Sequence, residues 1–265
     1  MNSIKIHVLH CGSIDLDEAV PYYTKTLHPA PYTGILRSKK HQMTVPVSAY
    51  LIEHPKGLIL IDTGWHTEIR NNAKKYLGWL YSISSTAHLE KSKAIHEQLE
   101  KLGYKTIDID YLFLSHLHPD HVSGLKLVSE AKQILTSNLE LQDTKKYPLL
   151  YKPFMWEGIN LQTFSFIDSE YDLFGDGSIV FVNTPGHTNG MASTLVQNNG
   201  RFVLLCADTA YTKKALDGMI IPGMTTDKKK ALTSLRWIKE MGDKPNCVEV
   251  LANHDPEVDP HTIEL

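Results

Sequence analysis

The chain has 265 residues, a length that layered α/β folds commonly use as one unit, and no linker, repeat or low-complexity tract divides it. Its 27 Lys and Arg against 30 Asp and Glu give a net charge of −3 without a block of like charge. Phosphate-backbone binding uses clustered Lys and Arg, so this composition argues against nucleic acid as a partner.

Other features of the composition limit the cellular setting. No run approaches the roughly 18 apolar residues of a membrane span, and the first residues do not have the pattern of a secretory signal. We therefore expect a soluble, cytoplasmic protein with a single domain over residues 1–265. The three cysteines are an odd number without close spacing, which predicts neither a disulfide framework nor a cysteine-based zinc site.

The first third of the chain has the period of β-strands. Alternating apolar residues predict strands over residues 4–9 and 43–52. A turn then leads into an apolar run, residues 58–61, which ends on Asp62. The least regular part of the chain follows over residues 70–85, where several aromatic side chains favour a mobile flap or a partner surface.

The pattern then changes to that of a helix over residues 87–103. Ile95, Leu99 and Leu102 recur at the spacing of one helix face. Gly103 suits a C-terminal cap, so we expect the helix to end there.

Strands and one further helix occupy the rest of the chain. The last helix is predicted over residues 227–241, with Thr226 as its N-cap and Leu232, Leu235 and Ile238 on its core side. Strands interspersed with helices favour a layered α/β fold. The predicted strands are residues 111–114, 133–135, 179–182, 192–196, 202–205 and 247–251.

The segment that carries most chemical information is SHLHPDHVSG, residues 115–124, at the end of an apolar strand. His116 and His118 are two positions apart and so point to the same side of the strand end, where they can chelate one ion. Asp120 and His121 follow at once and offer an oxygen and another imidazole to a neighbouring ion. Four ligands of the types that zinc prefers within six residues predict a metal site rather than a solvated loop.

This run resembles the HxHxDH signature of the metallo-β-lactamase superfamily. Three later segments match the superfamily in order, FVNTPGHTNG with His187, FVLLCADTAY with Asp208 and LANHDPE with His254. ILIDTG supplies Asp62, which in this superfamily usually supports the site from behind. The resemblance implies a four-layer αββα sandwich with a metal site at one edge of its two sheets.

The resemblance also implies a dinuclear centre. Two ions that share a water lower its pKa from 15.7 towards about 7, so hydroxide is available as a nucleophile at neutral pH. Zinc suits the mixed imidazole and carboxylate set, and iron, manganese or cobalt would also fit. The ligands implied are His116, His118 and His187 for the first ion, Asp120, His121 and His254 for the second, and Asp208 as a bridge between them.

A narrower resemblance concerns the substrate. DTAYTK, residues 208–213, is similar to a segment of quorum-quenching N-acyl homoserine lactonases in which a tyrosine faces the substrate. Tyr211 matches that tyrosine, and its phenol would donate to the lactone carbonyl oxygen as negative charge develops there. Asp120 would carry a proton from the shared hydroxide to the leaving ring oxygen. The resemblance thus implies hydrolytic opening of a small-molecule lactone or ester.

Two alternatives remain open. The chain could hydrolyse another ester, a thioester or a phosphodiester, because one scaffold hosts many reactions. It could also bind metals without turning over a substrate. Pro119, Met191 and Asn253 depart from the lactonase pattern, and they leave the acyl-chain preference undefined.

Overall fold

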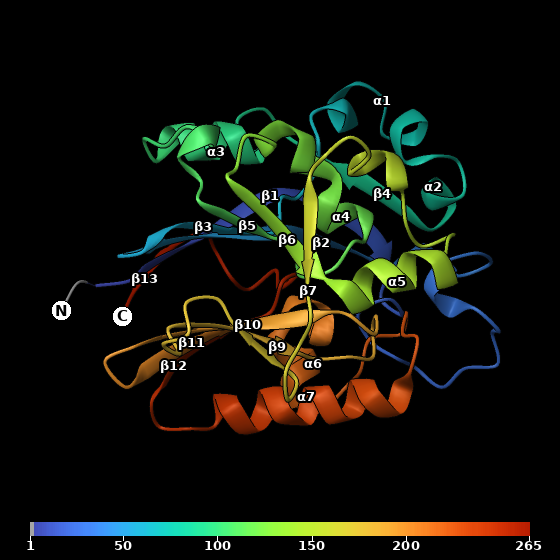
Figure 1. Ribbon diagram of the computed structural model, residues 1–265. Coiled ribbons are helices and arrows are strands. Elements are labelled where there is room, and N and C mark those ends of the chain that lie inside the picture. Colours follow the sequence, from blue (N-terminus) through green and yellow to red (C-terminus); the bar gives the residue numbers. More distant parts are fainter. Residues whose placement is uncertain (1–2) are drawn as a thin grey trace.

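Two β-sheets packed face to face form the centre of the structure (Figure 1). The computed structural model describes residues 3–265. The first sheet has eight strands in the order β13-β1-β2-β3-β5-β6-β7, with β4 paired to β1 outside this order. Its strands are β1 (Lys5–Asp17), β2 (Gln42–His54), β3 (Gly57–Ile61), β4 (Ser85–His88), β5 (Tyr111–Phe113), β6 (Gln133–Ser137), β7 (Leu161–Phe164) and β13 (Thr262–Glu264).

The second sheet has five strands in the order β12-β11-β10-β9-β8. These strands are β8 (Glu170–Asp172), β9 (Ile179–Asn183), β10 (Ala192–Asn198), β11 (Arg201–Leu205) and β12 (Cys247–Leu251). Between the two sheets lies an apolar cluster in which the rings of Phe113 and Phe181 stack with centroids 3.6 Å apart.

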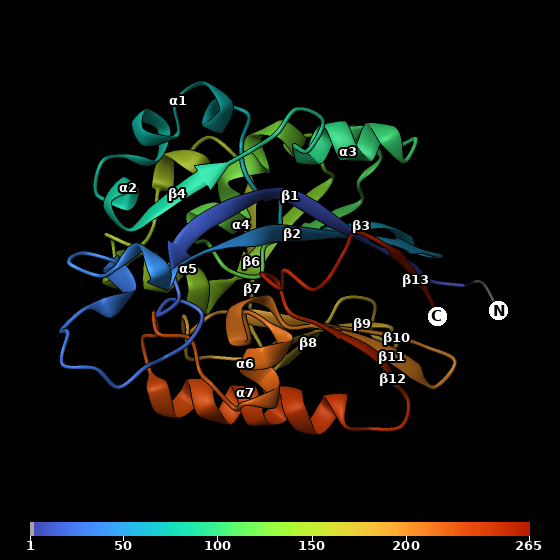
Figure 2. The ribbon, with the colours of Figure 1, turned by 180° about the vertical axis from the view of Figure 1, so that it is seen from behind.

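Helices cover the outer face of each sheet (Figures 1 and 2). Those over the first sheet are α1 (Glu68–Leu77), α2 (Tyr81–Ser84), α3 (Ile95–Lys101) and α4 (Pro119–Val122). Those over the second sheet are α6 (Lys213–Asp217) and α7 (Lys228–Gly242), while α5 (Asn138–Lys146) lies between these outer layers at one end of the sheets. This arrangement confirms the four-layer αββα sandwich.

Six short 3-10 helices complete the regular structure of the described residues. They are Pro31–Thr33, Lys39–His41, Thr106–Asp108, Ser123–Val128, Pro153–Met155 and Ala207–Thr209.

The predicted strands are confirmed, but β1 extends well beyond the predicted residues 4–9. In β1, Ile6 packs between the sheets, whereas Cys11 packs under the helices, as the alternation of a strand requires. A bulge around Gly12, where φ is +111°, shifts the register, and Ile14 then lies on the same side as Cys11. The bulge interrupts the period of two, and for that reason the strand pattern is lost after residue 9.

The predicted helix over residues 87–103 is wrong in its first half. The helix α3 begins only at Ile95. Residues 87 and 88 are the end of β4, in which Ala87 pairs with Ile14 of β1, and residues 89–94 form a turn-containing connection. Pairing with a long neighbouring strand outweighs the weak helical preference of this segment. The predicted end is right, because Gly103 has a φ of +87° directly after the last helical turn.

The last predicted helix is confirmed as α7, with two corrections. Its N-cap is Asp227, whose carboxylate accepts two backbone N–H groups of the first turn, whereas the hydroxyl of Thr226 donates to the carbonyl of Gly186. Leu232 is 38% exposed because it lies to one side of the buried face. The residues that α7 buries are Ala231, Ser234, Leu235 and Ile238.

Residues 70–85, the least regular part of the sequence, form most of α1 and α2. The helix α1 is broken by a non-helical backbone at Asn72. Trp79 is 67% exposed, whereas the ring of Tyr81 contacts that of Trp65 edge to face. The segment thus covers part of the first sheet, and its role as a flap or a partner surface stays a prediction.

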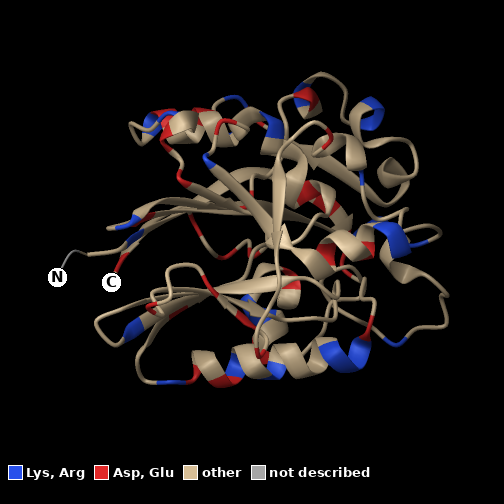
Figure 3. Cartoon of the chain, in the orientation of Figure 1, with Lys and Arg blue, Asp and Glu red and all other residues tan. Residues whose placement is uncertain are grey.

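Charged residues of both signs occur together along the outer helices (Figure 3). The helix α7, for example, begins with lysines at residues 228–230 and carries Glu240 near its other end. Among residues 3–265, no helix is long and apolar enough to cross a membrane. The cytoplasmic location and the exclusion of nucleic acid stay predictions.

Candidate metal centre

The predicted ligands follow strand ends at one edge of the sandwich. His116, Asp208 and His254 each lie three residues beyond the last residue of β5, β11 and β12. The strands β11 and β12 are parallel, as are β3 and β5, so their carboxyl ends meet at a common edge within each sheet. Asp120 and His121 belong to the short helix α4, which begins at Pro119, a residue that suits the first helical position.

The structure brings all seven predicted ligands together in two groups. Within each group the candidate donor atoms all lie within 4.8 Å of one another. Six of the seven residues are buried, and the side chain of Asp120 is 13% exposed. The first group is His116, His118 and His187, and the second is Asp120, His121, Asp208 and His254.

The carboxylate of Asp208 lies between the two groups. Its Oδ2 is 4.0 Å from Nε2 of His116 and 3.4 Å from Nε2 of His187. Its Oδ1 is 3.1 Å from Nε2 of His121 and 3.2 Å from Nε2 of His254. One oxygen therefore faces each group, which is the arrangement a bridging carboxylate requires.

Hydrogen bonds fix which nitrogen three of the histidines present to the centre. The Nδ1 atoms of His187 and His254 donate to the carbonyl oxygens of Met224 and Pro46, both at 2.7 Å. Because a carbonyl only accepts, the proton of the neutral ring sits on Nδ1 and Nε2 keeps a free lone pair. His121 is held in the same way, with Nδ1 2.8 Å from the carboxylate of Asp62. These contacts are typical of histidines that bind metals.

Asp62 supports the centre from behind. Its Oδ1 accepts the backbone N–H of Ser115 at 2.8 Å, and its Oδ2 accepts the hydroxyl of Ser115 at 2.7 Å as well as Nδ1 of His121. Asp62 has a φ of +59°, a left-handed conformation that Asp tolerates better than most residues. The side chain thus joins the end of β3 to the loop that follows β5.

Burial and neighbouring charges set the protonation of the centre. Burial lowers the pKa of His116 and His118 well below their usual range, so both rings are neutral. Burial would also lower the pKa of His121 and His254, but the carboxylate of Asp208 raises both. In turn these imidazoles hold the pKa of Asp208 well below its usual range, although burial opposes them. Positive charge is therefore favoured beside Asp208, where cations could take the place of protons.

Several donor atoms in the centre are buried without a hydrogen-bond partner. A buried polar atom in that state typically costs about 1–3 kcal/mol. In addition, Nδ1 of His118 lies 2.8 Å from Nε2 of His187, a separation that suits two nitrogens binding a common cation. The donor set therefore fits divalent metal ions. The unpartnered atoms of the seven ligands are Nε2 of His116, His118, His121 and His254, and Oδ1 of Asp208.

Tyr211 lies beside both groups. Its ring stacks on that of His254, with centroids 4.8 Å apart, and is edge-on to that of His187 at 6.0 Å. Burial raises the pKa of Tyr211 well above its usual range, and the nearby carboxylate of Asp208 adds to the effect. The phenol therefore stays protonated and able to donate.

Tyr81 and Glu140 lie near the centre but were not among the predicted site residues. Burial raises the pKa of Tyr81, and the carboxylates of Asp120 and Asp208 raise it further, so this residue of α2 is close enough to interact electrostatically with the centre. Burial also raises the pKa of Glu140 to about 7. The only sequence signal at Glu140 is its position three residues after Ser137, a spacing typical of a helix start rather than of a site.

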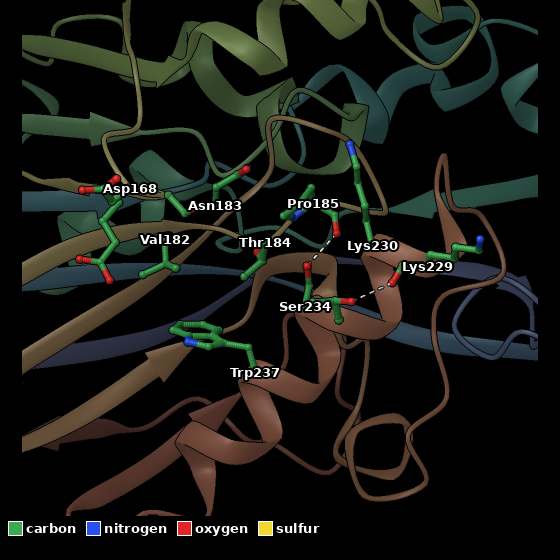
Figure 4. Close-up of a pocket in the computed structure, with 12 residues that line it drawn as sticks. Asp168, Val182, Asn183, Thr184, Pro185, Lys229, Lys230, Ser234 and Trp237 are labelled. Atoms are coloured by element: carbon green, nitrogen blue, oxygen red, sulfur yellow. Dashed lines mark hydrogen bonds between the residues drawn. The ribbon is translucent and has the colours of Figure 1, made fainter.

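A cavity of about 510 Å³ lies away from the seven ligands, on the outer side of the second sheet. It opens between β9, α7 and the residues before β8, and Trp237 forms one of its walls (Figure 4). Ser234 in this cavity donates to the carbonyl of Pro185 at 2.7 Å, which holds the loop that carries His187 from the outside. The cavity thus adjoins the outer side of the loop that carries His187.

The profile of the metallo-beta-lactamase superfamily matches residues 43–245, more than half of the chain. This chain belongs to the metallo-β-lactamase superfamily. Six of the seven candidate ligands lie inside the matched range, and His254 follows it.

Relatives of this superfamily member include lactonases. It is 28% identical to the N-acyl homoserine lactonase AttM of Agrobacterium fabrum over 242 residues, which cover 85% of this chain and 91% of that protein. The fold is shared with an N-acyl homoserine lactone hydrolase solved with N-hexanoyl-L-homoserine at its catalytic metal centre (TM-score 0.79, 24% identity, 97% and 95% coverage). It is also shared with AidC, a dizinc quorum-quenching lactonase (TM-score 0.62, 20% identity, 97% and 89% coverage).

Proposed function

We propose that this superfamily member is a metal-dependent hydrolase that opens the lactone ring of N-acyl homoserine lactones. Two divalent ions, with zinc the best match to the donors, would be held by the seven residues of the candidate centre. The observation that carries the proposal is the carboxylate of Asp208, which turns one oxygen to each histidine group beside the phenol of Tyr211. The AttM lactonase and the dizinc lactonase AidC support the choice of substrate and of metal.

The reaction needs an activated water, a donor to the carbonyl oxygen and a group that transfers a proton. The two ions, Tyr211 and Asp120 would supply these functions in turn. Two bound divalent ions would make a water strongly nucleophilic at neutral pH and polarise the substrate carbonyl. Tyr211 would donate from its phenol to the carbonyl oxygen as negative charge grows there. Asp120, whose side chain is partly exposed, would take a proton from the attacking water and pass it to the ring oxygen that leaves.

The substrate would enter beside the partly exposed side chain of Asp120. Tyr81 lies on this side, and the hydroxyl of Tyr22 is 3.1 Å from that of Thr212, the residue after Tyr211. Aromatic rings of this kind offer an apolar surface with a polar end, which suits a neutral lactone that carries an acyl chain.

The proposal is tested by a substrate panel at neutral pH. The panel contains N-acyl homoserine lactones of increasing acyl length, an open-chain ester, a thioester and a phosphodiester. We expect kcat/KM to be highest for the acyl homoserine lactones and to fall at least about 100-fold in Asp120→Asn, because its amide cannot carry the proton. Preference for another substrate would contradict the lactonase assignment, and metal-loaded protein without turnover would indicate a binding protein.

A further inference from the structure

The helix α5 contacts both loops that supply the first metal group. Glu140, in its first turn, is fully buried. Its Oε1 accepts the backbone N–H of Leu117 at 3.0 Å, and its Oε2 accepts the hydroxyl of Thr188 at 2.5 Å. Leu117 is the residue between the first two histidines of the HxHxDH run, and Thr188 directly follows His187. One carboxyl group thus connects two loops that are far apart in sequence.

Other contacts of α5 reach the second of these loops. Ser137 donates from its hydroxyl to the carbonyl of Gly190 at 2.7 Å. Asp143 accepts the backbone N–H of Asn189 at 2.6 Å. A Cβ at Gly190 would lie 1.9 Å from the backbone nitrogen of Glu140, so the loop and the helix are in direct backbone contact. Among Ser137, which is the N-cap of α5, and Glu140 and Asp143 within the helix, Glu140 is the residue that also contacts the HxHxDH loop.

The opposite side of the same loop is held by α7 and the residues before it. Ser234 donates to the carbonyl of Pro185 (Figure 4), and the hydroxyl of Thr226 donates to the carbonyl of Gly186 at 2.9 Å. A Cβ at Gly186 would lie 2.3 Å from the Cα of Ala231. The loop that carries His187 is therefore fixed from both sides, and the contact through Glu140 joins it to the HxHxDH loop.

A buried carboxyl group without a cationic partner is costly, so its contacts matter. Glu140 is not one of the seven residues whose donor atoms converge in the centre. Burial raises its pKa to about 7, while its hydrogen bonds to Thr188 and Leu117 act in the opposite direction. Without Glu140, the buried N–H of Leu117 would lose its acceptor.

We infer that Glu140 is a positioning residue, which fixes the loop of His116 and His118 against the loop of His187 so that three imidazoles reach one metal ion. The inference rests on the proposed metal centre. It assigns Glu140 to the first group of ligands, because its two hydrogen bonds adjoin these three histidines. The second group would be little affected by its loss.

The test measures zinc affinity rather than turnover. Metal-free full-length protein is titrated with zinc in competition with a chromophoric chelator, and His187→Ala and His254→Ala identify which binding step belongs to which group. We expect Glu140→Leu to weaken the first group about 10- to 100-fold and the second group less than about twofold. Glu140→Gln should stay close to wild type, because its amide can still accept from Leu117 and donate to the oxygen of Thr188.

Two more variants keep the test decisive if Glu140→Leu does not fold. Thr188→Val has nearly the same shape and removes one of the two hydrogen bonds, so we expect a smaller loss confined to the first group. Thr144→Val, on the same helix but with its hydroxyl bonded only to the carbonyl of Leu141 within that helix, is the matched control and should leave both affinities unchanged. Unchanged zinc binding in Glu140→Leu, or equal losses at both groups in Thr188→Val, would overturn the inference. Wild-type protein that binds no zinc would contradict the proposed centre itself.

Discussion

At the scale of single residues, the histidines of the centre are oriented by groups outside it. His187 and His254 each use one ring nitrogen to donate to a backbone carbonyl, and His121 uses one for Asp62. The other nitrogen of each ring faces Asp208. The roles of these residues are therefore testable through substitutions that leave every metal ligand in place.

Removing the hydroxyl group of Tyr211 tests whether this residue donates a hydrogen bond during turnover. Because Tyr211→Phe keeps the ring that stacks on His254, we expect metal content and folding to be unchanged and kcat to fall about 100-fold. Steady-state kinetics with an acyl homoserine lactone measures this effect. Tyr171→Phe, which removes a hydroxyl in the cluster between the sheets, is the control. Full kcat in Tyr211→Phe would rule out this role for the phenol.

Asp62→Asn tests whether the carboxylate of Asp62 orients the imidazole ring of His121. The amide nitrogen that replaces Oδ2 cannot accept a proton from Nδ1 of His121, so the ring loses its orientation. We expect the affinity of the second group for zinc to fall about 10- to 100-fold in a chelator competition. Asp110→Asn, before the start of β5 and far from the centre, serves as the control. An affinity equal to that of wild type would contradict the supporting role.

The sequence predicts ligands better than it predicts the residues that position them. His116, His118 and Asp120 are recognisable because a metal admits few residue types and the strand end dictates their spacing. Glu140 has no such spacing, since its partners are a backbone N–H and a hydroxyl from distant segments. Its position after Ser137 suggests a helix start, and only the three-dimensional structure reveals which way its side chain points.

At the scale of elements, strands are predictable where the period of two is unbroken. The strands β5, β9 and β12 are short and apolar, and their predicted ends agree with the structure to within one residue. In contrast, β4 follows a helix-like pattern and exists because it pairs with β1. The strands β8 and β13 have three residues each and only one apolar or aromatic residue apiece, so, unlike β5, they contain no apolar run that could be recognised.

The contact between α5 and the loop at Gly190 leads to a steric prediction. A methyl group at Gly190 would overlap the backbone of α5, so Gly190→Ala must move the helix or the loop. We expect a loss of at least about 2 kcal/mol in the free energy of unfolding, together with weaker zinc binding by the first group. Urea unfolding and zinc titration measure both. Gly103→Ala, at an open position, should cost only about 1 kcal/mol and leave zinc binding intact.

The ion pair of Arg70 and Glu97 connects α1 to α3 and gives a pH-dependent stability. The hydrogen bonds from Arg70 lower the pKa of Glu97 from 4.5 to about 2. A lowered pKa in the folded state means that the stabilisation is complete above about pH 4.5 and is lost as the pH falls towards 2. We expect Glu97→Gln to lower the free energy of unfolding by up to about 1 kcal/mol at pH 7 and by much less near pH 2.

This prediction is checked by urea unfolding of both proteins across that pH range. Glu100→Gln, on the same helix and more exposed, is the matched control, and its stability should follow that of wild type. A difference between wild type and Glu97→Gln that does not shrink as the pH falls would contradict the account of the ion pair.

At the scale of the whole molecule, the centre joins the two halves of the sandwich. Asp62 and His116 follow strands of the first sheet, whereas Asp208 and His254 follow strands of the second. The layered α/β class is predictable from the succession of strands and helices, and the motifs specify the superfamily. Which acyl chain is preferred is not predictable in this way, because it depends on side chains such as Tyr81 that reach the centre through tertiary packing.

The central claim is that these seven side chains hold two ions that are needed for lactone opening. The most direct test is to titrate chelator-treated, metal-free protein with zinc and to follow the hydrolysis of N-hexanoyl homoserine lactone. We predict no turnover without metal and a rise in activity that reaches its plateau at two equivalents of zinc per chain. Full activity in the metal-free protein, or no turnover with two equivalents bound, would contradict the claim.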